Sequence, residues 1–366
     1  MHLRMSFGTV FAGAVLMVMT SVFMTVGLSS LSFQPAPSDI ARPLTAQEAR
    51  GRQIYISNGC VYCHTQYVRP QDWNAAGGGK ASRVAQAGDY VFLQTMLLGS
   101  ERTGPDLSQE GGIHPDDWHK AHFKNPRYTS PQSIMPQFSF IKDQELDDLI
   151  AYVQSLGGKA ADARVSQMRA QQDEVLKGWY TSYETHLAQI KEMVPPTWRD
   201  LKSAMTPTTR SLLHGKQIFL SNCVGCHGQN GNGRGPASSS MKPDPADFTR
   251  VELQVSASDG QFYQYLLFGL PGTSMPAWGD FLTVNDIWDT INFLRTIPKG
   301  GLTLPDSELK PEMMLNYDPR YGGEGAGKYP GPQPSNPDKA LDNPYCYITP
   351  AASATQTAGC EKLVQK

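Results

Sequence analysis

Cys60-Val61-Tyr62-Cys63-His64 decides the fold of this chain, because the same spacing returns as Cys223-Val224-Gly225-Cys226-His227. The spacing Cys-x-x-Cys-His is the attachment signature of c-type haem. Each thiol of such a motif bonds one vinyl group of the porphyrin, and the histidine ligates the iron. The alternative is a zinc or redox Cys-x-x-Cys motif that happens to precede a histidine, and the second copy disfavours it. We therefore predict haem attachment at Cys60, Cys63, Cys223 and Cys226, with His64 and His227 as iron ligands.

The residues before each motif repeat as well. Residues 51–58 (GRQIYISN) match residues 215–222 (GKQIFLSN) position by position, and only Gly59 is an extra residue. Repeats on this scale indicate duplicated structural units. The repeat predicts two small domains that each bind a haem, so that the chain carries two covalently bound haem c groups.

Composition and the remaining cysteines give weaker indications. The 366 residues allow two or three domains, and a net charge of −2 does not suggest a nucleic-acid partner. The motif implies an extracytoplasmic location, where haem is attached. The two cysteines outside the motifs, Cys346 and Cys360, are expected to form a disulfide rather than stay free thiols, which fits an oxidising compartment.

The N-terminus is apolar. Residues 7–33 contain no charged side chain, and about 20 helical residues span the hydrocarbon core of a bilayer. A cleaved signal peptide is the alternative, but its apolar region is shorter and ends in a small-residue site that is absent here. Arg4 precedes the run, which favours a cytoplasmic N-terminus. We predict an uncleaved, single-pass anchor within residues 1–39, with the haem domains on the outer side.

The first haem domain is predicted over residues 40–157. Met135, in a Ser-Ile-Met-Pro segment, is the favoured sixth ligand of the iron, with Met96 as its rival and a core methionine as the structural alternative. Apolar spacing predicts a helix over residues 145–156. The Gly-Pro segment at Pro105 is similar to that of small cytochromes c, in which the proline carbonyl accepts a hydrogen bond from the proximal histidine.

The second haem domain is predicted over residues 207–297 and repeats the same order of elements. Met275 is the expected sixth ligand, and Pro236 takes the role proposed for Pro105. Trp278 is expected near the haem edge, and a closing helix is predicted over residues 285–296.

Two segments carry no chemistry. Residues 158–206 are expected to form a connector with one long helix, which Pro195 and Pro196 break. Residues 298–366 are rich in Pro and Gly, and we favour an ordered arm over a disordered tail. The predicted fold is mainly α: one transmembrane helix, two class I cytochrome c domains and an irregular C-terminal arm.

The first part of the chain resembles a specific family, the mono-haem subunit of cbb(3)-type cytochrome c oxidases. The resemblance covers roughly residues 1–157 and is carried by residues 59–70, 99–107, 117–122, 125–127 and 133–136. It implies that the haem passes electrons to a large membrane subunit that carries b-type haem and a haem–copper centre. The Gly/Ala-rich residues 75–88 depart from the family in a region that normally meets partners.

The resemblance also bears on charged and metal-binding candidates. Arg69, Arg102 and Arg127 are candidate partners of haem propionates, with surface solvation as the alternative. His119 and His122 belong to the Trp-His motif of the family and are not expected to form a metal pair. Residues 207–297 resemble the class I cytochromes c of the di-haem subunit of the same oxidases, and this fusion is not the usual layout of the family.

With His and Met on both irons, we predict one-electron transfer and no catalytic site on this chain. The predicted function is a di-haem cytochrome of the bacterial inner membrane. It carries electrons from a periplasmic donor, a soluble cytochrome c or small copper protein, through the second haem and the first to the catalytic subunit of a haem–copper oxidase. The alternatives are the same role in a nitric oxide reductase and a membrane-tethered shuttle for a dehydrogenase. A di-haem peroxidase needs an open iron, and the two Met-Pro segments disfavour it.

Overall fold

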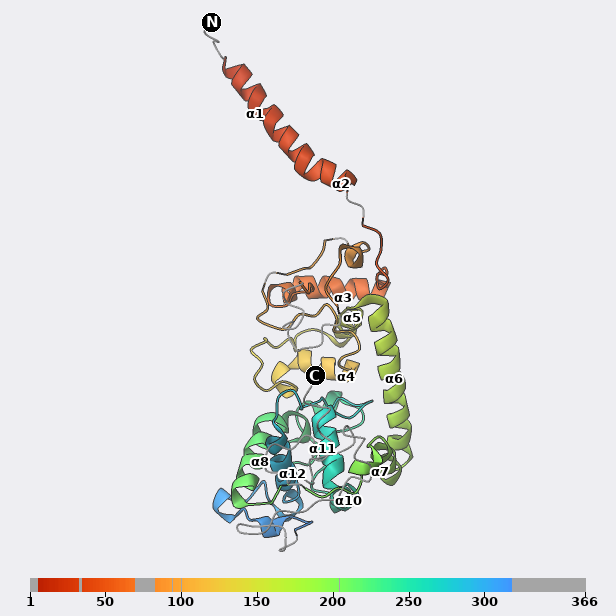
Figure 1. Cartoon of the computed structure of the whole chain (residues 1–366), viewed down its shortest axis with the longest axis vertical. Helices are drawn as coiled ribbons and strands as arrows, with labels where there is room; N and C mark the ends of the chain where they lie inside the picture. The colour runs from red at the N-terminus through yellow and green to blue at the C-terminus, as the bar shows by residue number, and fades with distance from the viewer. Residues whose placement is uncertain are drawn as a thin grey trace, which may run out of the picture. The chain divides into compact units, whose positions relative to one another are not determined.

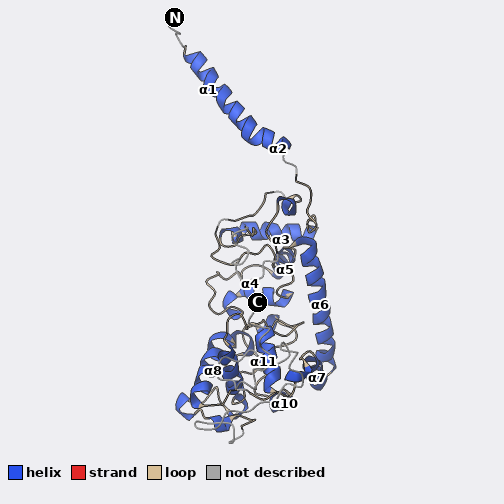
Figure 2. Ribbon diagram, in the orientation of Figure 1, coloured by secondary structure: helices blue, strands red, loops and turns tan. Residues whose placement is uncertain are grey.

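The computed structural model describes residues 6–32, 35–69, 83–93, 95–99, 101–203 and 205–317 (Figure 1). All regular elements in these ranges are helices joined by loops and turns, and none is a strand (Figure 2). The mainly α fold predicted from the sequence is confirmed.

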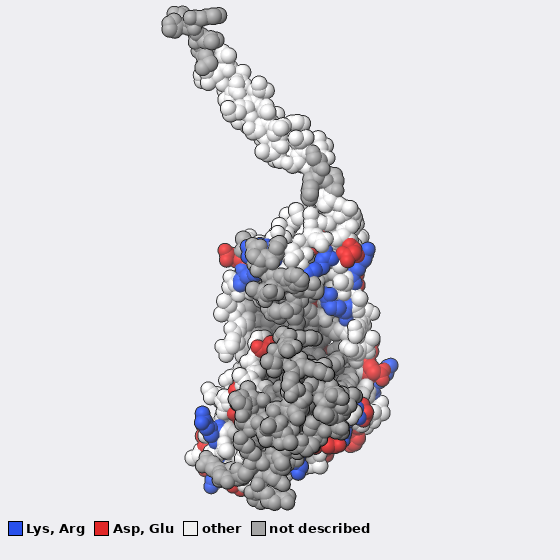
Figure 3. Space-filling view, viewed as in Figure 1, with Lys and Arg blue, Asp and Glu red and all other residues white. Residues whose placement is uncertain are grey.

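The N-terminal segment is one apolar helical rod. It runs through α1 (Phe7–Val22), a π-helical turn η1 (Phe23–Gly27) and α2 (Leu28–Ser32). The 25 residues Phe7–Leu31 are long and apolar enough to cross a membrane. In the view of Figure 3 no Lys, Arg, Asp or Glu colours this helix. The helix is therefore a candidate membrane span, and whether it is cleaved remains a prediction.

The chain divides into two compact units. The first comprises Met1–Thr45, Val61–Gln109 and Gly157–Ala160, and the second comprises Ala46–Cys60, Glu110–Leu156 and Ala161–Lys366. These limits cut across the first haem domain predicted from the sequence. The predicted domain limits stay predictions.

The described loops of the first unit are held by side-chain hydrogen bonds around a short 3-10 turn, η4 (Ala87–Tyr90). Asp89 accepts hydrogen bonds from Ser38 Oγ at 2.6 Å and from Arg83 Nη2 at 2.7 Å. The hydroxyl of Tyr90 donates to the carbonyl of Gln66 at 2.8 Å. These bonds join segments distant in sequence, so the unit is tied together although it contains little regular structure.

Most of the helices belong to the second unit. They are α3 (Ala46–Ser57), α4 (Asp116–Lys124), η5 (Pro126–Tyr128), α5 (Asp143–Gln154), α6 (Gly158–Thr181), α7 (Tyr183–Glu192), η6 (Pro196–Trp198), α8 (Thr209–Asn222), α9 (Val224–His227), η7 (Ser238–Ser240), α10 (Val251–Ser256), α11 (Asp259–Phe268), α12 (Val284–Leu294), η8 (Ile297–Lys299), η9 (Asp306–Glu308) and η10 (Pro311–Met313). The helices predicted over residues 145–156 and 285–296 are α5 and α12, each shifted by one or two residues.

The two halves of the sequence repeat share one packing arrangement. Helix α3 packs on α5, and α8 packs on α12. At the first crossing a Cβ on Gly51 would overlap the carbonyl of Asp148, and at the second a Cβ on Gly215 would overlap the carbonyl of Asp289. Glycine is therefore required at both positions, because a side chain would push the paired helices apart. The repeat seen in the sequence is a repeat of this helix pair.

The core of the second cytochrome region gathers around α12. Four of its apolar residues are buried: Ile287, Trp288, Ile291 and Leu294. Tyr263 of α11 stacks on Trp288, with ring centroids 4.5 Å apart. Burial of aromatic rings on this scale dominates the energetics of a small core.

The connector differs from its prediction. It contains two helices, α6 and α7, instead of the one long helix expected before Pro195. Ser182 separates them because its backbone is extended (φ −165°, ψ 161°) and its side chain accepts a hydrogen bond from Thr185 N, which makes it an N-cap. Proline then ends α7 as predicted, and η6 follows from Pro196.

The beginning of the C-terminal arm packs on the second cytochrome region. Leu309 and Met314 are buried in its core. Leu315 N donates to the carbonyl of Arg295 at 3.2 Å. Residues 298–317 thus form an ordered arm. The predicted Cys346–Cys360 disulfide lies outside the described residues.

Candidate haem-binding sites

The first motif follows directly on α3. Gly59, the extra residue of the repeat, has φ 71°, a left-handed conformation that suits glycine, and Cys60 then begins a 3-10 turn, Cys60–Tyr62. His64 Nδ1 lies 2.8 Å from the carbonyl oxygen of Pro105, which is the contact predicted from the Gly-Pro segment. An Nδ1–H donated to this carbonyl makes Nε2 the nitrogen that would ligate a metal.

Gly104 brings Pro105 to the histidine. Its amide donates to the carbonyl of Cys63 at 2.9 Å, and a Cβ at this position would fall on the imidazole ring of His64. Only glycine allows the loop to lie this close.

Arg102 supports the chain that follows the motif. Its guanidinium donates to Thr65 Oγ1 at 2.8 Å and to the carbonyl of Tyr67 at 2.7 Å, and it lies 3.7 Å from Asp106. Asp106 in turn accepts from the amide of Tyr67 at 2.9 Å. Arg102 thus fixes residues 65–67, while its contact with a haem propionate remains a prediction, as does that of the exposed Arg69.

Met135 lies in the second unit and is half-buried, on a loop held by Arg127. Arg127 Nη1 donates to the carbonyls of Ser133 and Met135, both at 3.0 Å. Met135 N donates to Ser133 Oγ at 3.2 Å. Arg127 therefore positions the methionine loop, and its predicted contact with a propionate is not tested. The rival ligand Met96 is 55% exposed.

The second motif begins at the end of α8. Cys223 caps α8, and the short helix α9 contains His227, which is 8% exposed. The ring of His227 lies 4.7 Å from the ring of Phe248. Burial lowers the pKa of His227, so its imidazole is neutral near pH 7, the form that ligates metals.

The role predicted for Pro236 falls to another residue. His227 Nδ1 lies 3.0 Å from the carbonyl oxygen of Ala246, not of Pro236. The Gly-Pro segment does take the expected place beside the motif, since Gly235 N donates to the carbonyl of Cys226 at 3.0 Å, as Gly104 N does to Cys63. The second loop is longer, however, and the bond from Phe248 N to the carbonyl of Gly231 (2.7 Å) brings Ala246 to the histidine.

Met275 and Trp278 follow α11 on one loop. Met275 N donates to Thr273 Oγ1 at 3.1 Å, as Met135 N does to a serine in the first region. Met275, Trp278 and Cys223 are half-buried and pack on the same apolar cluster. The proximity that Trp278 was expected to have to a haem edge stays a prediction.

The thiols of the second motif are not activated. Burial raises the pKa of Cys223 and of Cys226 to about 12. Redox-active Cys-x-x-Cys centres instead lower the pKa of a thiol, because the thiolate is the nucleophile. This observation disfavours the redox alternative for the motif.

The residues present fit a covalently attached haem. Both histidines direct Nδ1 at a backbone carbonyl, and in the second region an apolar cluster gathers a motif cysteine and the predicted methionine ligand. An apolar surround with a fixed proximal histidine is what tunes the potential of a haem. Within the described ranges, no group of three or more Cys, His, Asp or Glu could hold a bare metal ion.

His119 and His122 are part of a stack of rings on α4. Trp118 lies between His114 and His122, with centroid distances of 3.8 and 4.6 Å. Burial lowers the pKa of His119 to about 4, and His122 Nδ1 lies 2.7 Å from Thr129 Oγ1. His119 and His122 are therefore packed against neighbouring side chains.

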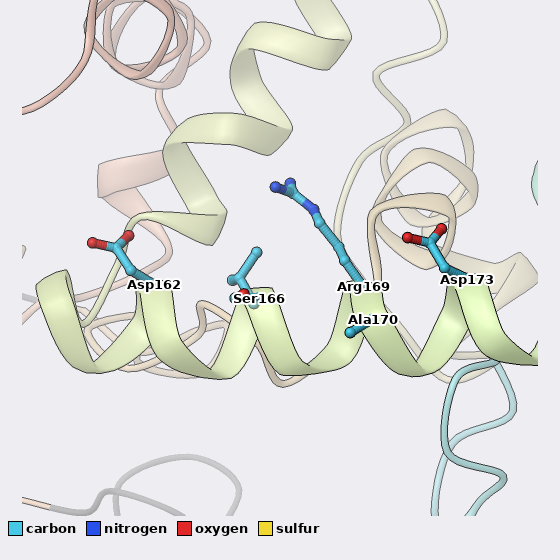
Figure 4. Close-up of a pocket in the computed structure, with 6 residues that line it drawn as sticks. Asp162, Ser166, Arg169, Ala170 and Asp173 are labelled. Carbon is cyan, nitrogen blue, oxygen red and sulfur yellow. The ribbon is translucent and has the colours of Figure 1, made fainter.

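A hollow of about 450 Å³ lies along α6 (Figure 4). Its lining consists of Asp162, Val165, Ser166, Arg169, Ala170 and Asp173. All six belong to one helix and none to a cysteine motif, so the hollow contributes nothing to the haem sites.

Two contributors escaped the sequence analysis. Ala246 is one, because nothing in its type marks a carbonyl that faces a histidine. Asp117 is the other: its carboxylate accepts hydrogen bonds from Ser274, next to Met275, and from Lys242 N. It is part of the Trp-His motif quoted for the family resemblance, but a contact over so many residues leaves no local signal.

Comparisons with known proteins agree with the two halves. Residues 4–154 match the family described as cytochrome c oxidase, mono-haem subunit/FixO, and residues 212–298 match the family described as cytochrome c. No curated protein matches the chain. A solved structure, the reducing HAO-like protein complex Kustc0457/Kustc0458 of Kuenenia stuttgartiensis, is 17% identical, with a TM-score of 0.24 over 71% of this chain and 99% of that one.

The two family matches confirm the resemblances drawn from the sequence. Residues 4–154 are similar to the mono-haem subunit of a cytochrome c oxidase, and residues 212–298 match a class I cytochrome c domain. The structural likeness is too low to establish a shared fold.

Proposed function

We propose that this membrane-associated c-type cytochrome of oxidase electron transfer carries two haem c groups and passes electrons between them. The electrons come from a small periplasmic carrier and go to the catalytic subunit of a cbb(3)-type oxidase. The two family matches support the oxidase assignment and the covalent haem. The number of haems, the donor and the side of the membrane are part of the proposal.

One observation supports two haems above all others: the surroundings of the two motifs share three structural features. In each, a helix crosses its partner at a glycine, and a Gly-Pro amide is bonded to the second motif cysteine. In each, the histidine Nδ1 faces a carbonyl oxygen. A motif that had lost its haem would have no need of these three features.

Bound haem iron supplies reversible one-electron chemistry. In this proposal Cys60 and Cys63 fasten the first group, and His64 and Met135 are its axial ligands. The bond from His64 to the Pro105 carbonyl fixes the ring and its tautomer. Arg127 holds the loop of Met135.

The second group is fastened by Cys223 and Cys226 and ligated by His227 and Met275. The carbonyl of Ala246 orients His227. His227 is buried, and the apolar cluster beside the motif would favour the ferrous state. If Met135 and Met275 ligate the two irons, neither iron would be open to substrate, and bond-making would belong to the oxidase subunit.

The proposed order is donor, second haem, first haem, oxidase. The first cytochrome region follows the candidate membrane span directly in the sequence, so its haem is expected nearer to the membrane partner. A Met275→Ala variant tests the order. Electron input at the full rate in this variant would contradict it.

The test of the function uses the full chain, purified in mild detergent from cells that attach haem c. We expect two haems per chain by pyridine haemochrome and mass, and one in a Cys223→Ser, Cys226→Ser variant. We also expect a multi-span b-haem protein to co-purify and reduce oxygen. Nitric oxide reduction without oxygen reduction would move the chain to the alternative reductase, and an inert chain without partner would support the tethered shuttle.

A further inference from the structure

The second cytochrome region is not held by its own residues alone. Residues 116–128, which comprise α4 and η5 and which we call the clamp segment, belong to the first cytochrome region. This segment contacts both parts of the second region that bear predicted haem ligands. One contact is at the Cys223–His227 motif, and the other is at the loop of Met275.

At the motif, the contact is a tight backbone approach. The carbonyl of Tyr128 lies 3.8 Å from Cys226 Sγ, and a Cβ on Gly225 would overlap this carbonyl. Ala121 of the clamp segment is buried together with Ala237 and Met241 of the second region. The clamp segment therefore packs directly on the motif.

At the methionine loop, the contact is a hydrogen-bond network centred on Asp117. Its Oδ1 accepts from Ser274 Oγ at 2.7 Å, and its Oδ2 accepts from Lys242 N at 3.0 Å. Gln172 of α6 donates to Oδ2 at 3.3 Å and to the carbonyl of Lys242 at 3.0 Å. Hydrogen bonds to a carboxylate are about twice as strong as neutral ones.

The bond to Ser274 bears directly on the neighbouring Met275. Ser274 is 8% exposed, so its hydroxyl has little access to water when Asp117 is removed. The other bonds to this loop are local: Thr273 accepts from Met275 N, and Leu270 N donates to the carbonyl of Met275 at 3.2 Å. Asp117 therefore supplies the polar tie between the loop and a distant part of the chain.

We propose that Asp117 is a positioning residue for Met275: by holding Ser274, it sets how firmly the methionine sulfur is presented to the second iron. The proposal rests on the proposed function, since it needs a haem at the second motif. A thioether is a weak ligand that an external base can displace, so a looser loop makes displacement easier. Residues that support a metal ligand typically change the affinity of a site by about 10–100-fold when they are lost.

The test measures how strongly imidazole displaces the methionine of the second haem in the full chain. Loss of the long-wavelength absorption band of Met-ligated ferric haem reports the displacement. The displacement step that is lost in a Met275→His variant is assigned to the second haem. The variants are Asp117→Ala, Asp117→Asn, Ser274→Ala and the double variant Asp117→Ala, Ser274→Ala.

Asp116→Asn is the matched control. Asp116 lies in the same first turn of α4, but its carboxylate bonds to Gln154 and Arg169 and not to the second region. We expect Asp116→Asn to leave the imidazole affinity unchanged. We expect Asp117→Ala and Ser274→Ala each to raise it about tenfold, the factor that one charge-assisted hydrogen bond represents. Asp117→Asn should fall between, because an amide has one acceptor oxygen and cannot accept from both Ser274 Oγ and Lys242 N.

The double variant separates positioning from general damage. If both residues act through one bond, the double variant binds imidazole no more tightly than either single variant. The proposal would be overturned if a chain with two haems bound imidazole with the same affinity in Asp117→Ala, Ser274→Ala and Asp116→Asn. A chain with one haem would instead refute the proposed function before any variant is compared. If Asp117→Ala does not fold, Asp117→Asn and Ser274→Ala decide the outcome.

Discussion

An alanine at either helix crossing should destabilise the cytochrome region that contains it. At the second crossing, a Cβ on Gly215 would overlap the carbonyl oxygen and carbon of Asp289 and approach Phe293 Cβ to 2.9 Å. At the first, Gly51 meets the corresponding atoms of Asp148 and Tyr152. These atoms belong to the facing helix backbone or lie directly on it, so no rotamer change can relieve the overlap.

The magnitude follows from two opposed effects. Alanine in a helix interior gains about 1 kcal/mol over glycine by propensity. Overpacking a well-packed contact costs about 1–3 kcal/mol, and a clash with a backbone belongs at the upper end. The net loss is therefore about 2 kcal/mol at each crossing. For a domain of this size, that corresponds to a fall in melting temperature of about 8–16 °C.

Gly178 of α6 is the control for this experiment. It is also a buried helical glycine, but a Cβ there would meet the end of the Gln189 side chain, which can move aside. Gly178→Ala should therefore be neutral or stabilising. We would follow thermal unfolding of Gly51→Ala, Gly215→Ala and Gly178→Ala by circular dichroism and by the haem absorbance.

The comparison refutes the reasoning if the crossing variants melt at the temperature of Gly178→Ala. A second outcome would limit it to one region. If Gly215→Ala is destabilised and Gly51→Ala is not, then the two crossings are not equivalent, although their contacts correspond atom for atom.

Three further predictions follow from buried or paired charges. Arg295→Met leaves the buried carboxylate of Asp259 without its cation, so we expect a loss of about 3–5 kcal/mol in urea unfolding of the second region. The hydrogen bond from Arg50 lowers the pKa of Asp148, so Asp148→Asn should lower the melting temperature at pH 7. Its difference from the wild type should begin to shrink as the pH falls below about 4 and vanish only below the lowered folded pKa. Arg127→Gln should ease displacement of the first methionine ligand by imidazole, whereas Arg127→Ala should ease it further.

The repeated stretch was the most informative part of the sequence. Because residues 51–58 and 215–222 match, they predicted two similar domains, and each stretch lies in a helix that precedes its motif. The spacing of apolar residues predicted α5 and α12 for the same reason: one face of each helix is buried. Apolar spacing of this kind predicts a helix wherever the helix packs on one side only.

The predictions that differed depend on contacts between distant residues or on one backbone angle. Ser182 interrupts the connector by an extended conformation that apolar periodicity does not encode. Ala246 replaces Pro236 beside His227 because a longer loop carries a different carbonyl to the ring, and any residue type offers a carbonyl. Arg102 and Arg127 hold loops beside the predicted ligands, which their type alone could not indicate, and their contacts with haem propionates stay predictions.

The two helix crossings differ in the side chain that pairs with the facing aspartate. The position before each crossing glycine pairs with the aspartate on the facing helix, through Arg50 and Asp148 in one copy and through His214 and Asp289 in the other. The first pair is an arginine on a carboxylate and the second a histidine on a carboxylate. Correspondingly, the bond from Arg50 lowers the pKa of Asp148, while burial raises that of Asp289.

This difference has a consequence for the acid side of the stability curve. The contribution of Asp148 is present above its unfolded pKa and is lost as the pH falls through its lowered folded pKa. The raised pKa of Asp289 has the opposite sign, because protonation of this buried carboxyl favours the folded state as the pH falls. By these two groups alone, acid should weaken the α3–α5 pair before the α8–α12 pair. The clamp segment joins the two regions through Asp117 and Tyr128, so loss of the first pair should then reach the second methionine loop as well.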